Sequence, residues 1–531
     1  MLYIQQEPTG TPTPDAPAPI PPEYSPLMTP NPTPAPIRIK EWAFERHDEV
    51  FAWIYLVLGF LFFRYLILKQ DGLITTIVCL VMLILAAVYV RLSKKEIRAS
   101  HKITWGILAA AALPFSLSHD PLLHTLCAVL LVIGTAWWVR SITIGCGFVS
   151  RFFLPDLADA SLSFPLNNFA ALPKSIYHGF KSSSGGKKFG MIALGIGLAI
   201  IPTLVIGGLL ASADAGMERM LAEIAYVIFS EDLTVIVWQL MLAIPTAFFL
   251  YAGIYSNQNT KLSPVISDEA YESLFDKNRN IPNLILYTSL IPIFILYITY
   301  VVSQLSYFAS AFADSLPMRS YSAYARRGFF ELCWIAVINL IILLILNGCA
   351  KQSGKNAPRT LKIFGAMLCG FTLFIILTAI GKMGLYMANY GLTRKRVLTF
   401  WFMLLLTVCF LVLLVRQFKQ IPTAKILTTG FLILFAALCI IRPDALIAKY
   451  NISRYADGSL DELDISTLCG DLSDDAYVVM LSNTDIIEQS GDISYFKSRL
   501  RYRQSKYEDS VLNILNLSSF LVYTTSYEFT T

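Results

Sequence analysis

The sequence is poor in charged residues. Asp, Glu, Lys and Arg make up only 15% of the 531 residues, whereas hydrophobic residues make up 55%. Soluble domains carry about 25% charged residues, so the composition excludes a soluble globular protein and indicates long stretches that face lipid. We therefore predict an all-α, polytopic membrane helical bundle with the lipid bilayer as its main partner.

The N-terminus lacks the basic start and apolar stretch of a cleavable signal peptide. Its first 36 residues contain twelve prolines and no Lys or Arg. Such composition is typical of disordered or polyproline II chain. We predict a disordered tail over residues 1–40, which more often serves as a spacer than as a ligand for a partner.

Motifs for catalysis and for cofactor binding are also missing. The nine cysteines form no C-x-x-C pair, and Ser184-Gly-Gly-Lys187 lacks the spacing of a phosphate-binding loop. His119, Asp120 and His124 lie close together near a predicted turn, which is a weak metal signal. We therefore predict no metal, no cofactor and no nucleic-acid partner, and more likely a binding protein than an enzyme.

Hydrophobic runs predict about eleven membrane spans, since a span needs about 20 apolar residues. The first four runs cover 50–68, 73–90, 103–117 and 122–139; the others cover 190–210, 233–255, 281–307, 329–346, 361–387, 397–415 and 426–441. The third run is short and contains Pro114. If it and the fourth formed a re-entrant pair, nine spans would remain, so the range is nine to eleven.

Basic residues in the connecting segments favour a cytoplasmic N-terminus and an extracytoplasmic C-terminus. With that orientation the inner segments hold 24 Lys and Arg and the outer loops hold nine. The bias weakens in the last two outer loops, which contain Arg326, Arg327, Arg394, Lys395 and Arg396. The segment 140–188 is rich in Phe and Pro and is expected to lie along the inner membrane surface.

The chain after the last span changes character. Residues 442–531 hold eight Lys and Arg against fourteen Asp and Glu, a balance of −6. Within the predicted organisation of tail (1–40), transmembrane domain (41–441) and C-terminal domain (442–531), this last part is a small acidic α-helical domain. Its charge is opposite to that of the basic outer loops, so we expect it to dock on the outer ends of spans eight to ten.

Polar residues follow one helical face in each of the seventh, eighth and ninth spans. These stripes are Tyr297, Tyr300, Gln304 and Tyr307; Arg327, Glu331 and Asn339; and Thr378, Lys382, Tyr386 and Asn389. Arg327 and Glu331 are spaced to form an ion pair. The stripes share one membrane half, which favours a polar cleft; hydrogen bonding between helices is the alternative explanation.

Four stretches carry a resemblance to a known family: 209–214 (LLASAD), 324–332 (YARRGFFEL) with Asn339, 390–396 (YGLTRKR), and 451–455 (NISRY) leading to Asp475-Ala476 and to Asn516-Leu-Ser. Over about residues 190–520 the chain resembles bacterial multi-pass membrane proteins catalogued as a domain of unknown function, the four-one-seven-three type. The resemblance implies a bacterial membrane location and no established activity, substrate or cofactor.

In the predicted topology all four stretches fall on the outer face. We therefore expect a binding site there for an extracytoplasmic ligand or protein, in a sensor or an envelope-related protein. The alternatives are a secondary transporter with a polar path through spans seven to nine, and a membrane-embedded transferase. The predicted outer-face residues are Asp214, Tyr297, Tyr300, Gln304, Arg326, Arg327, Glu331, Asn339, Lys382, Tyr386, Arg394, Arg396, Asn451 and Arg454.

Overall fold

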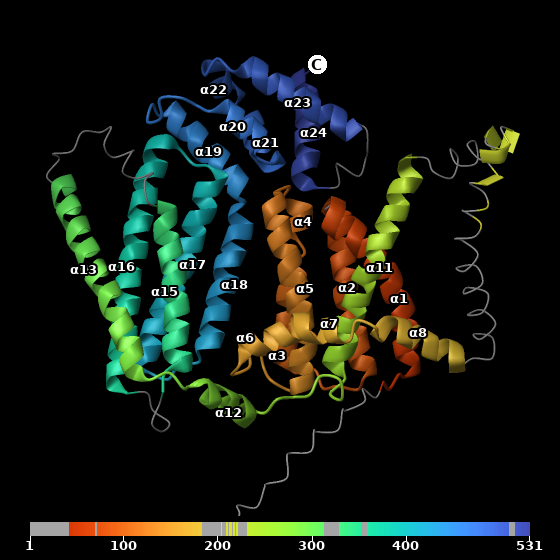
Figure 1. Ribbon diagram of the computed structural model, residues 1–531. Helices are drawn as coiled ribbons and strands as arrows, with labels where there is room; N and C mark the ends of the chain where they lie inside the picture. The colour runs from red at the N-terminus through yellow and green to blue at the C-terminus, as the bar shows by residue number, and fades with distance from the viewer. Residues whose placement is uncertain are drawn as a thin grey trace, which may run out of the picture. The chain divides into compact units, whose positions relative to one another are not determined.

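The computed structural model describes residues 42–69, 72–182, 231–312, 329–351, 358–508 and 516–530, with isolated positions between 203 and 220. The predicted tail 1–40 and both Arg326 and Arg327 lie outside these residues, and so does almost all of the predicted fifth span. The described residues form helices and one isolated β-bridge, between Ile281 and Ala350. The predicted all-α class is therefore confirmed (Figure 1).

Nine helices of the described residues are long and apolar enough to cross a membrane. They are Arg46–Lys69, Gly72–Leu92, Pro121–Ile144, Val237–Gln258, Asn283–Gln304, Glu331–Cys349, Arg359–Tyr390, Arg394–Phe418 and Thr423–Ile441. Each coincides with one of the eleven predicted runs. The remaining two predicted runs are 190–210, of which the structure describes only isolated positions, and 103–117.

The run 103–117 forms two short helices rather than one, α3 (Ala99–Ala110) and α4 (Pro114–Leu117). The break falls just before Pro114, where the ring has no N–H to donate to the preceding turn. Together the two helices follow α5 (Pro121–Ile144) from its end to its start: the His101 ring contacts the Cys146 carbonyl at 2.8 Å, and Ser118 lies beside the first turn of α5. The described chain therefore forms a broken helix antiparallel to α5, and the alternative of a re-entrant pair stays a prediction.

A first bundle contains α1 (Arg46–Phe62), its π-helical extension η1 (Phe63–Lys69), α2 (Gly72–Leu92), α3, α5 and α11 (Glu231–Gln258). Helices α1 and α11 approach closely because Gly59 faces Ala247; a Cβ on Gly59 would lie 2.4 Å from the Ala247 Cβ. Small residues allow such close approach between helices in membranes.

A second bundle contains α13 (Asn283–Phe312), α15 (Phe329–Cys349), α16 (Arg359–Tyr390) and α17 (Arg394–Phe418) around a separate apolar core. Helix α18 (Thr423–Ile441) links the two bundles. Its Leu434 carbonyl accepts a hydrogen bond from Trp401 of α17 at 2.9 Å, while Phe435 and Leu438 pack into the core of the first bundle.

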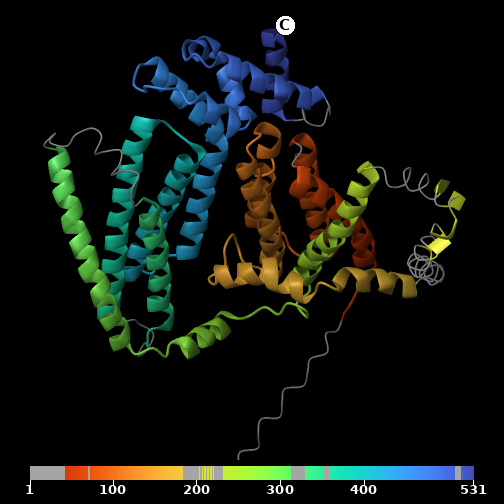
Figure 2. The same ribbon diagram turned by 45° about the horizontal axis from the view of Figure 1, so that its top comes forward.

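Short helices lie across one end of the membrane helices (Figure 2). They are α6 (Phe153–Ala158), η2 (Asp159–Ser163), α7 (Phe164–Asn167), α8 (Ala171–Ser182) and, after α11, α12 (Asp268–Asn278). Leu154, Leu162 and Leu166 on them are 70%, 56% and 58% exposed. Exposed leucines between polar residues are typical of a membrane–water boundary. They support the prediction that 140–188 lies along the membrane surface.

At the other end lies a group of six helices, which we call the cap: α19 (Pro443–Ala456), α20 (Ile465–Gly470), α21 (Asp474–Leu481), α22 (Thr484–Gln489), α23 (Ile493–Glu508) and α24 (Leu517–Thr530). The cap has its own apolar core, in which Ile447, Tyr477, Phe496 and Leu500 are fully buried. Burial of these side chains, which come from α19, α21 and α23, holds the short helices together.

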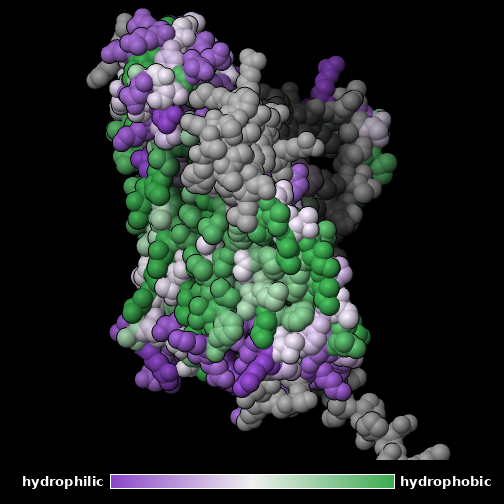
Figure 3. Space-filling model, turned by 90° about the vertical axis from the view of Figure 1, so that its left-hand side faces the viewer, coloured by the Kyte–Doolittle hydropathy of each residue, from purple (hydrophilic) through white to green (hydrophobic). Residues whose placement is uncertain are grey.

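Surface polarity follows the same division. In Figure 3, which views the second bundle from the side, hydrophobic side chains form a belt between a polar cap and a polar opposite end. An exposed apolar surface of that extent indicates a membrane-embedded protein. We refer below to the cap end and the opposite end of the helices.

Candidate functional site

Charged and polar side chains from distant parts of the chain meet where the cap contacts the two bundles. The contributing segments are residues 115–120 at the end of α4 and before α5, the start of α17, the α18–α19 junction, α21 and the last two cap helices. We call this region the cap interface. Its principal charged residues are Asp120, Arg394, Arg442, Asp444, Asp474, Asp475 and Arg503.

A sharp reversal of the chain builds one side of the cap interface. Helix α18 ends at Ile441 and α19 begins at Pro443, so Arg442 alone makes the turn, with a φ of 53°. Such left-handed backbone is unfavourable for a residue with a side chain and persists only where its surroundings hold it. The Arg442 guanidinium supplies that restraint by pairing with Asp475 at 2.5 Å.

Asp444 connects the cap to the second bundle. Its carboxylate is fully buried and accepts a bidentate pair of hydrogen bonds from Arg394 at the start of α17, with Nε at 3.0 Å from Oδ1. The backbone N–H of Ser473 also donates to Oδ2, at 2.8 Å. A planar guanidinium with a carboxylate in this geometry fixes both distance and orientation.

The same arginine also faces the first bundle. Its Nη2 lies 4.0 Å from Oδ1 of Asp120, which caps α5 by accepting a hydrogen bond from Leu122 N at 3.0 Å. Burial and the neighbouring Asp444 charge raise the pKa of Asp120 to about 6, although Arg394 and the α5 amides act in the opposite direction. Two buried carboxylates therefore share one guanidinium, and a proton binds to Asp120 more readily than to an ordinary aspartate.

Asp475 and Asn516 connect the cap to the first bundle. Asp475 accepts hydrogen bonds from the Ser118 hydroxyl and, at 3.4 Å, from the His119 backbone N–H. Asn516 donates through its side-chain amide to the Phe115 carbonyl at 2.9 Å. These contacts place α21 and the start of α24 directly over the turn between α4 and α5.

A second buried acid stands beside Asp475. Asp474 is paired with Arg503 of α23 and accepts hydrogen bonds from Tyr507 and from Ser519, the latter at 2.5 Å. Burial opposes ionisation of Asp474, yet the charges of His119 and Arg503 together with these hydrogen bonds hold its pKa below the ordinary value. The Asp474 carboxylate is therefore ionised at neutral pH.

The loop between α16 and α17 is tied to α19. Asn451 receives a hydrogen bond from Leu392 N at 2.6 Å and donates to the Leu392 carbonyl at 2.8 Å. Gly391 before it has a φ of 70°, and a Cβ there would lie 2.6 Å from the Asn451 side-chain oxygen. Arg454 of the same helix donates to the Ala388 carbonyl at 3.0 Å. Glycine is therefore required for the close approach of Asn451.

Five of the predicted site residues thus meet at the cap interface or beside it: Tyr386, Arg394, Arg396, Asn451 and Arg454. Arg396 donates to the Tyr390 and Gly391 carbonyls at 2.9 and 2.6 Å and lies 4.2 Å from the centre of the Tyr386 ring. The expected docking of the C-terminal region is confirmed for the end of span nine and the start of span ten. The contact with residues 115–120 was not predicted.

The other predicted residues lie elsewhere. Tyr297 donates to Asn339 at 2.6 Å, and Asn339 donates to Thr372 at 2.9 Å, so α13, α15 and α16 share a buried hydrogen-bonded chain. Gln304 and Lys382 are buried in the second bundle, and Tyr300 packs against its core. Glu331 is exposed, and its predicted partner Arg327 lies outside the described residues.

Asp214 is exposed, and its carboxylate accepts a hydrogen bond from Met217 N within its own turn, at 2.8 Å. No local sequence pattern identified Arg442, Asp444, Asp474 and Arg503, four of the ion-paired residues of the cap interface. A signal was present in the Asp475-Ala476 and Asn516-Leu-Ser stretches, which carried the family resemblance. The weak metal signal is explained otherwise: His119 faces Ser519 and Asp474 at 3.2 and 3.8 Å, and His124 contacts the Ser118 carbonyl at 2.8 Å.

Comparison with known proteins assigns most of the chain to a family. Residues 103–483 fit the family model described as "Domain of unknown function (DUF4153)". This corrects the family number expected from the resemblance, and the match begins earlier and ends earlier than the expected 190–520. No curated protein and no solved structure matches the chain. The matched region runs from α3 to the end of α21 and includes Asp120, Arg394, Arg442, Asp444 and Asp475.

Proposed function

We propose, from the premise that this chain belongs to the DUF4153 family, that it is a membrane protein whose cap end binds a ligand or a partner. The cap would pass the bound state on to both helical bundles, as a sensor or an envelope-related protein does. The observation that carries this proposal is the double attachment of the cap. Asp444 and Asn451 join it to the second bundle, while Asp475 and Asn516 join it to the first.

The chemistry of the cap interface supports a role beyond stability. Asp444, Asp474 and Asp475 are all fully buried. Removing charges from water costs several kcal/mol per ion, and well-packed apolar residues often stabilise such an interface at least as well. Buried charges do, however, give an interface two discrete arrangements, paired and separated, which is the property that a signalling contact requires.

Transport along a polar path through the second bundle is the second candidate function. Tyr297, Asn339 and Thr372 form a series of hydrogen bonds, and Lys382, in the same helix as Thr372, is also buried. These hydrogen bonds form a series that ends inside the bundle: the Asn339 oxygen accepts from Tyr297, its amide donates to Thr372, and Thr372 donates to the Leu368 carbonyl of its own helix at 2.6 Å. Hydrogen bonds of this kind commonly join helices in membranes. A transporter therefore has less support than binding at the cap end.

A complementation experiment separates the two candidates. In a strain lacking the chromosomal gene, variants Arg394→Gln and Asp475→Asn would be compared with Asn339→Leu and Lys382→Met at matched membrane levels. The proposal predicts that the first two lose complementation and the last two keep it. Loss confined to Asn339→Leu and Lys382→Met would favour transport and remove the support for the cap end.

Orientation is part of the proposal, since the excess of Lys and Arg in the predicted inner segments favours a cap outside the cytoplasm. Asp457 lies in an exposed turn of the cap. A cysteine introduced there, in a variant from which the nine native cysteines are removed, should react with a membrane-impermeant maleimide in intact cells. Labelling only after permeabilisation would place the cap in the cytoplasm.

A further inference from the structure

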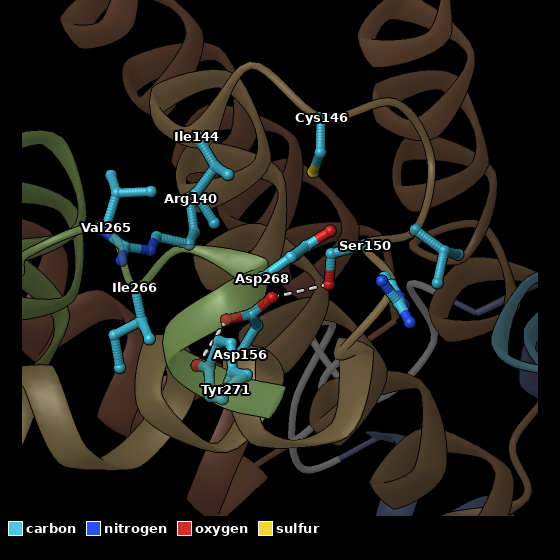
Figure 4. A pocket seen from close by; sticks show the side chains of 11 residues that line it. Arg140, Ile144, Cys146, Ser150, Asp156, Val265, Ile266, Asp268 and Tyr271 are labelled. Carbon is cyan, nitrogen blue, oxygen red and sulfur yellow. Dashed lines mark hydrogen bonds between the residues drawn. The ribbon is translucent and has the colours of Figure 1, made fainter. Parts of the chain in front are cut away.

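A cavity of about 230 Å³ lies at the opposite end of the first bundle, far from the cap interface in the fold (Figure 4). Its walls come from the last turns of α5, the following loop 145–152, α6 and the first turns of α12. Drug-sized ligands occupy about 300–1,000 Å³, so this cavity suits a smaller group.

The position of the cavity relates it to the membrane boundary. Two wall residues, Arg140 and Ile144, belong to the last turns of the candidate span Pro121–Ile144. Exposed Leu154 and Leu162 project from α6 and η2, which cross the same end of the bundle. A cavity at the end of a candidate span, beside exposed leucines, is expected at the level of lipid headgroups.

Carboxylates provide the acceptors in the wall. Asp156 is oriented by hydrogen bonds from the Tyr271 hydroxyl at 2.7 Å and the Ser150 hydroxyl at 2.6 Å. Asp268, at the start of α12, has no hydrogen bond or ion pair to its carboxylate within the described residues. Figure 4 shows both acids among the side chains that line the cavity. The pair offers acceptors for a ligand that carries several N–H donors.

Guanidinium groups provide positive charge in the same wall. Arg140 is only 3% exposed; it donates to the Ser263 and Pro264 carbonyls at 2.9 Å each, and its Nε has no partner in the described part of the chain. Arg151 is 62% exposed and pairs with Glu272 of α12 at 2.5 Å. The exposed Arg151 is able to exchange this surface pair for an anionic group, because surface ion pairs contribute little stability.

We propose that this cavity binds a primary ammonium group joined to a phosphate, as in the headgroup of phosphatidylethanolamine. The ammonium donates to Asp156 and Asp268, and the phosphate faces Arg151. The chemistry requires both charges: an acidic pair alone would suit any cation, and the arginines alone would suit any anion. The location at the end of a span favours a membrane lipid as the source over a soluble molecule.

Lipid retention tests the proposal. The full-length protein is reconstituted into nanodiscs of equal parts phosphatidylethanolamine, phosphatidylcholine and phosphatidylglycerol, re-extracted in mild detergent, and its retained lipids are counted by native mass spectrometry. Phosphatidylcholine has no N–H on its nitrogen. The loss of a charge-assisted hydrogen bond should therefore favour phosphatidylethanolamine by about tenfold.

Two variants of α12 provide the comparison. Asp268→Asn should abolish the preference, whereas Glu269→Gln, a change at the adjacent exposed residue outside the cavity wall, should preserve it. Equal retention of the three lipids by the unmodified protein would overturn a lipid ligand. A preference that survives in Asp268→Asn would overturn the assigned site.

Soluble phosphoethanolamine distinguishes the source of the headgroup. If a lipid is the ligand, the soluble compound should displace phosphatidylethanolamine only weakly, because it lacks the acyl chains. Binding of the soluble compound by calorimetry, dependent on Asp268 and without any lipid preference, would keep the ammonium–phosphate chemistry and assign it to a free molecule. Absence of both kinds of binding would reject the proposal.

Discussion

The cap interface and the interior of the second bundle solve the same problem with different chemistry. Both bury polar side chains that join separate helices. The bundle interior uses the neutral groups of Tyr297, Asn339 and Thr372, whereas the cap interface uses ionised groups such as Arg394 with Asp444. Neutral hydrogen bonds between membrane helices are worth about 0.6 kcal/mol on average, and a buried charge left alone costs several times more.

This difference indicates which contacts between helices are permanent and which depend on conditions. Neutral hydrogen-bonding groups cost less free energy to bury than charges do, and their pairing does not depend on protonation. They therefore suit a helix contact that stays fixed. A buried ion pair is stable only while both partners are present, and its balance changes with protonation or a competing ion. The double attachment of the cap is therefore the part of the fold most sensitive to conditions outside the helices.

The largest expected effect comes from Arg394→Gln. Removal of the guanidinium leaves Asp444 fully buried without its main partner, which should cost about 3–5 kcal/mol. Thermal unfolding in detergent, with protease cleavage of the cap as a second readout, would measure the loss. The double variant Arg394→Gln with Asp444→Asn should recover part of it. Lys395→Gln changes the exposed neighbouring base and should have little effect; equal losses in both single variants would contradict the account.

A smaller effect is expected for Asn339→Leu. The change leaves the Tyr297 and Thr372 hydroxyls without their Asn339 partner, but it leaves no unpaired charge buried in the core. The destabilisation should be about 1–2 kcal/mol, as for other buried hydrogen bonds. Thr378→Val is the matched control, because within the described helices that hydroxyl donates to the Phe374 carbonyl of its own helix and to no other helix. A loss as large as that of Arg394→Gln would erase the distinction between the two regions.

The smallest effect concerns pH. A pKa of about 6 for Asp120 in the folded protein lies above the value of about 4 for an unfolded aspartate, so the folded state holds this proton more tightly. The associated stability is complete below about pH 4 and is lost as pH rises through 6. Between pH 7 and pH 5 the folded state should gain about 1 kcal/mol from this group.

Asp120→Asn should remove that gain, and Asp457→Asn, at an exposed cap position, should retain it. Asp474 does not interfere, because its pKa lies below the ordinary value and its contribution is lost only at more acidic pH. Thermal unfolding of the three proteins at pH 5 and pH 7 provides the comparison. An identical pH dependence of stability in wild type and Asp120→Asn would show that Asp120 does not contribute to it.

Local sequence was sufficient for the nine candidate spans of the described residues and insufficient for the cap interface. The run 397–415 lies inside the observed Arg394–Phe418, because a helix that faces lipid is marked by its own apolar residues. The stripe rule also placed Tyr297 and Asn339 on faces that do meet. By contrast, Ser118 and Asp475 are 357 positions apart, and no helical or strand period relates residues at that separation.

The break between α3 and α4 is intermediate between these cases. Pro114 signalled an interruption, but the sequence could not decide between a re-entrant pair and a broken span. That choice depends on where the two ends pack: His101 beside Cys146 and Leu108 beside Gly134 set α3 along α5. The sequence likewise did not distinguish the carboxylates that are buried at the cap interface from those that face solvent. The net charge of 442–531 is the same whichever of them become buried.

Hydrogen–deuterium exchange of the full-length protein in nanodiscs is the most direct test of the double attachment. Wild type and Arg394→Gln would be compared peptide by peptide, because the substitution lies in α17 of the second bundle. If the cap interface joins both bundles, exchange should rise in 443–456 of the cap and also in 116–124 of the first bundle. An increase confined to the first turns of α17, with 116–124 unchanged, would contradict the claim that the cap couples the two bundles.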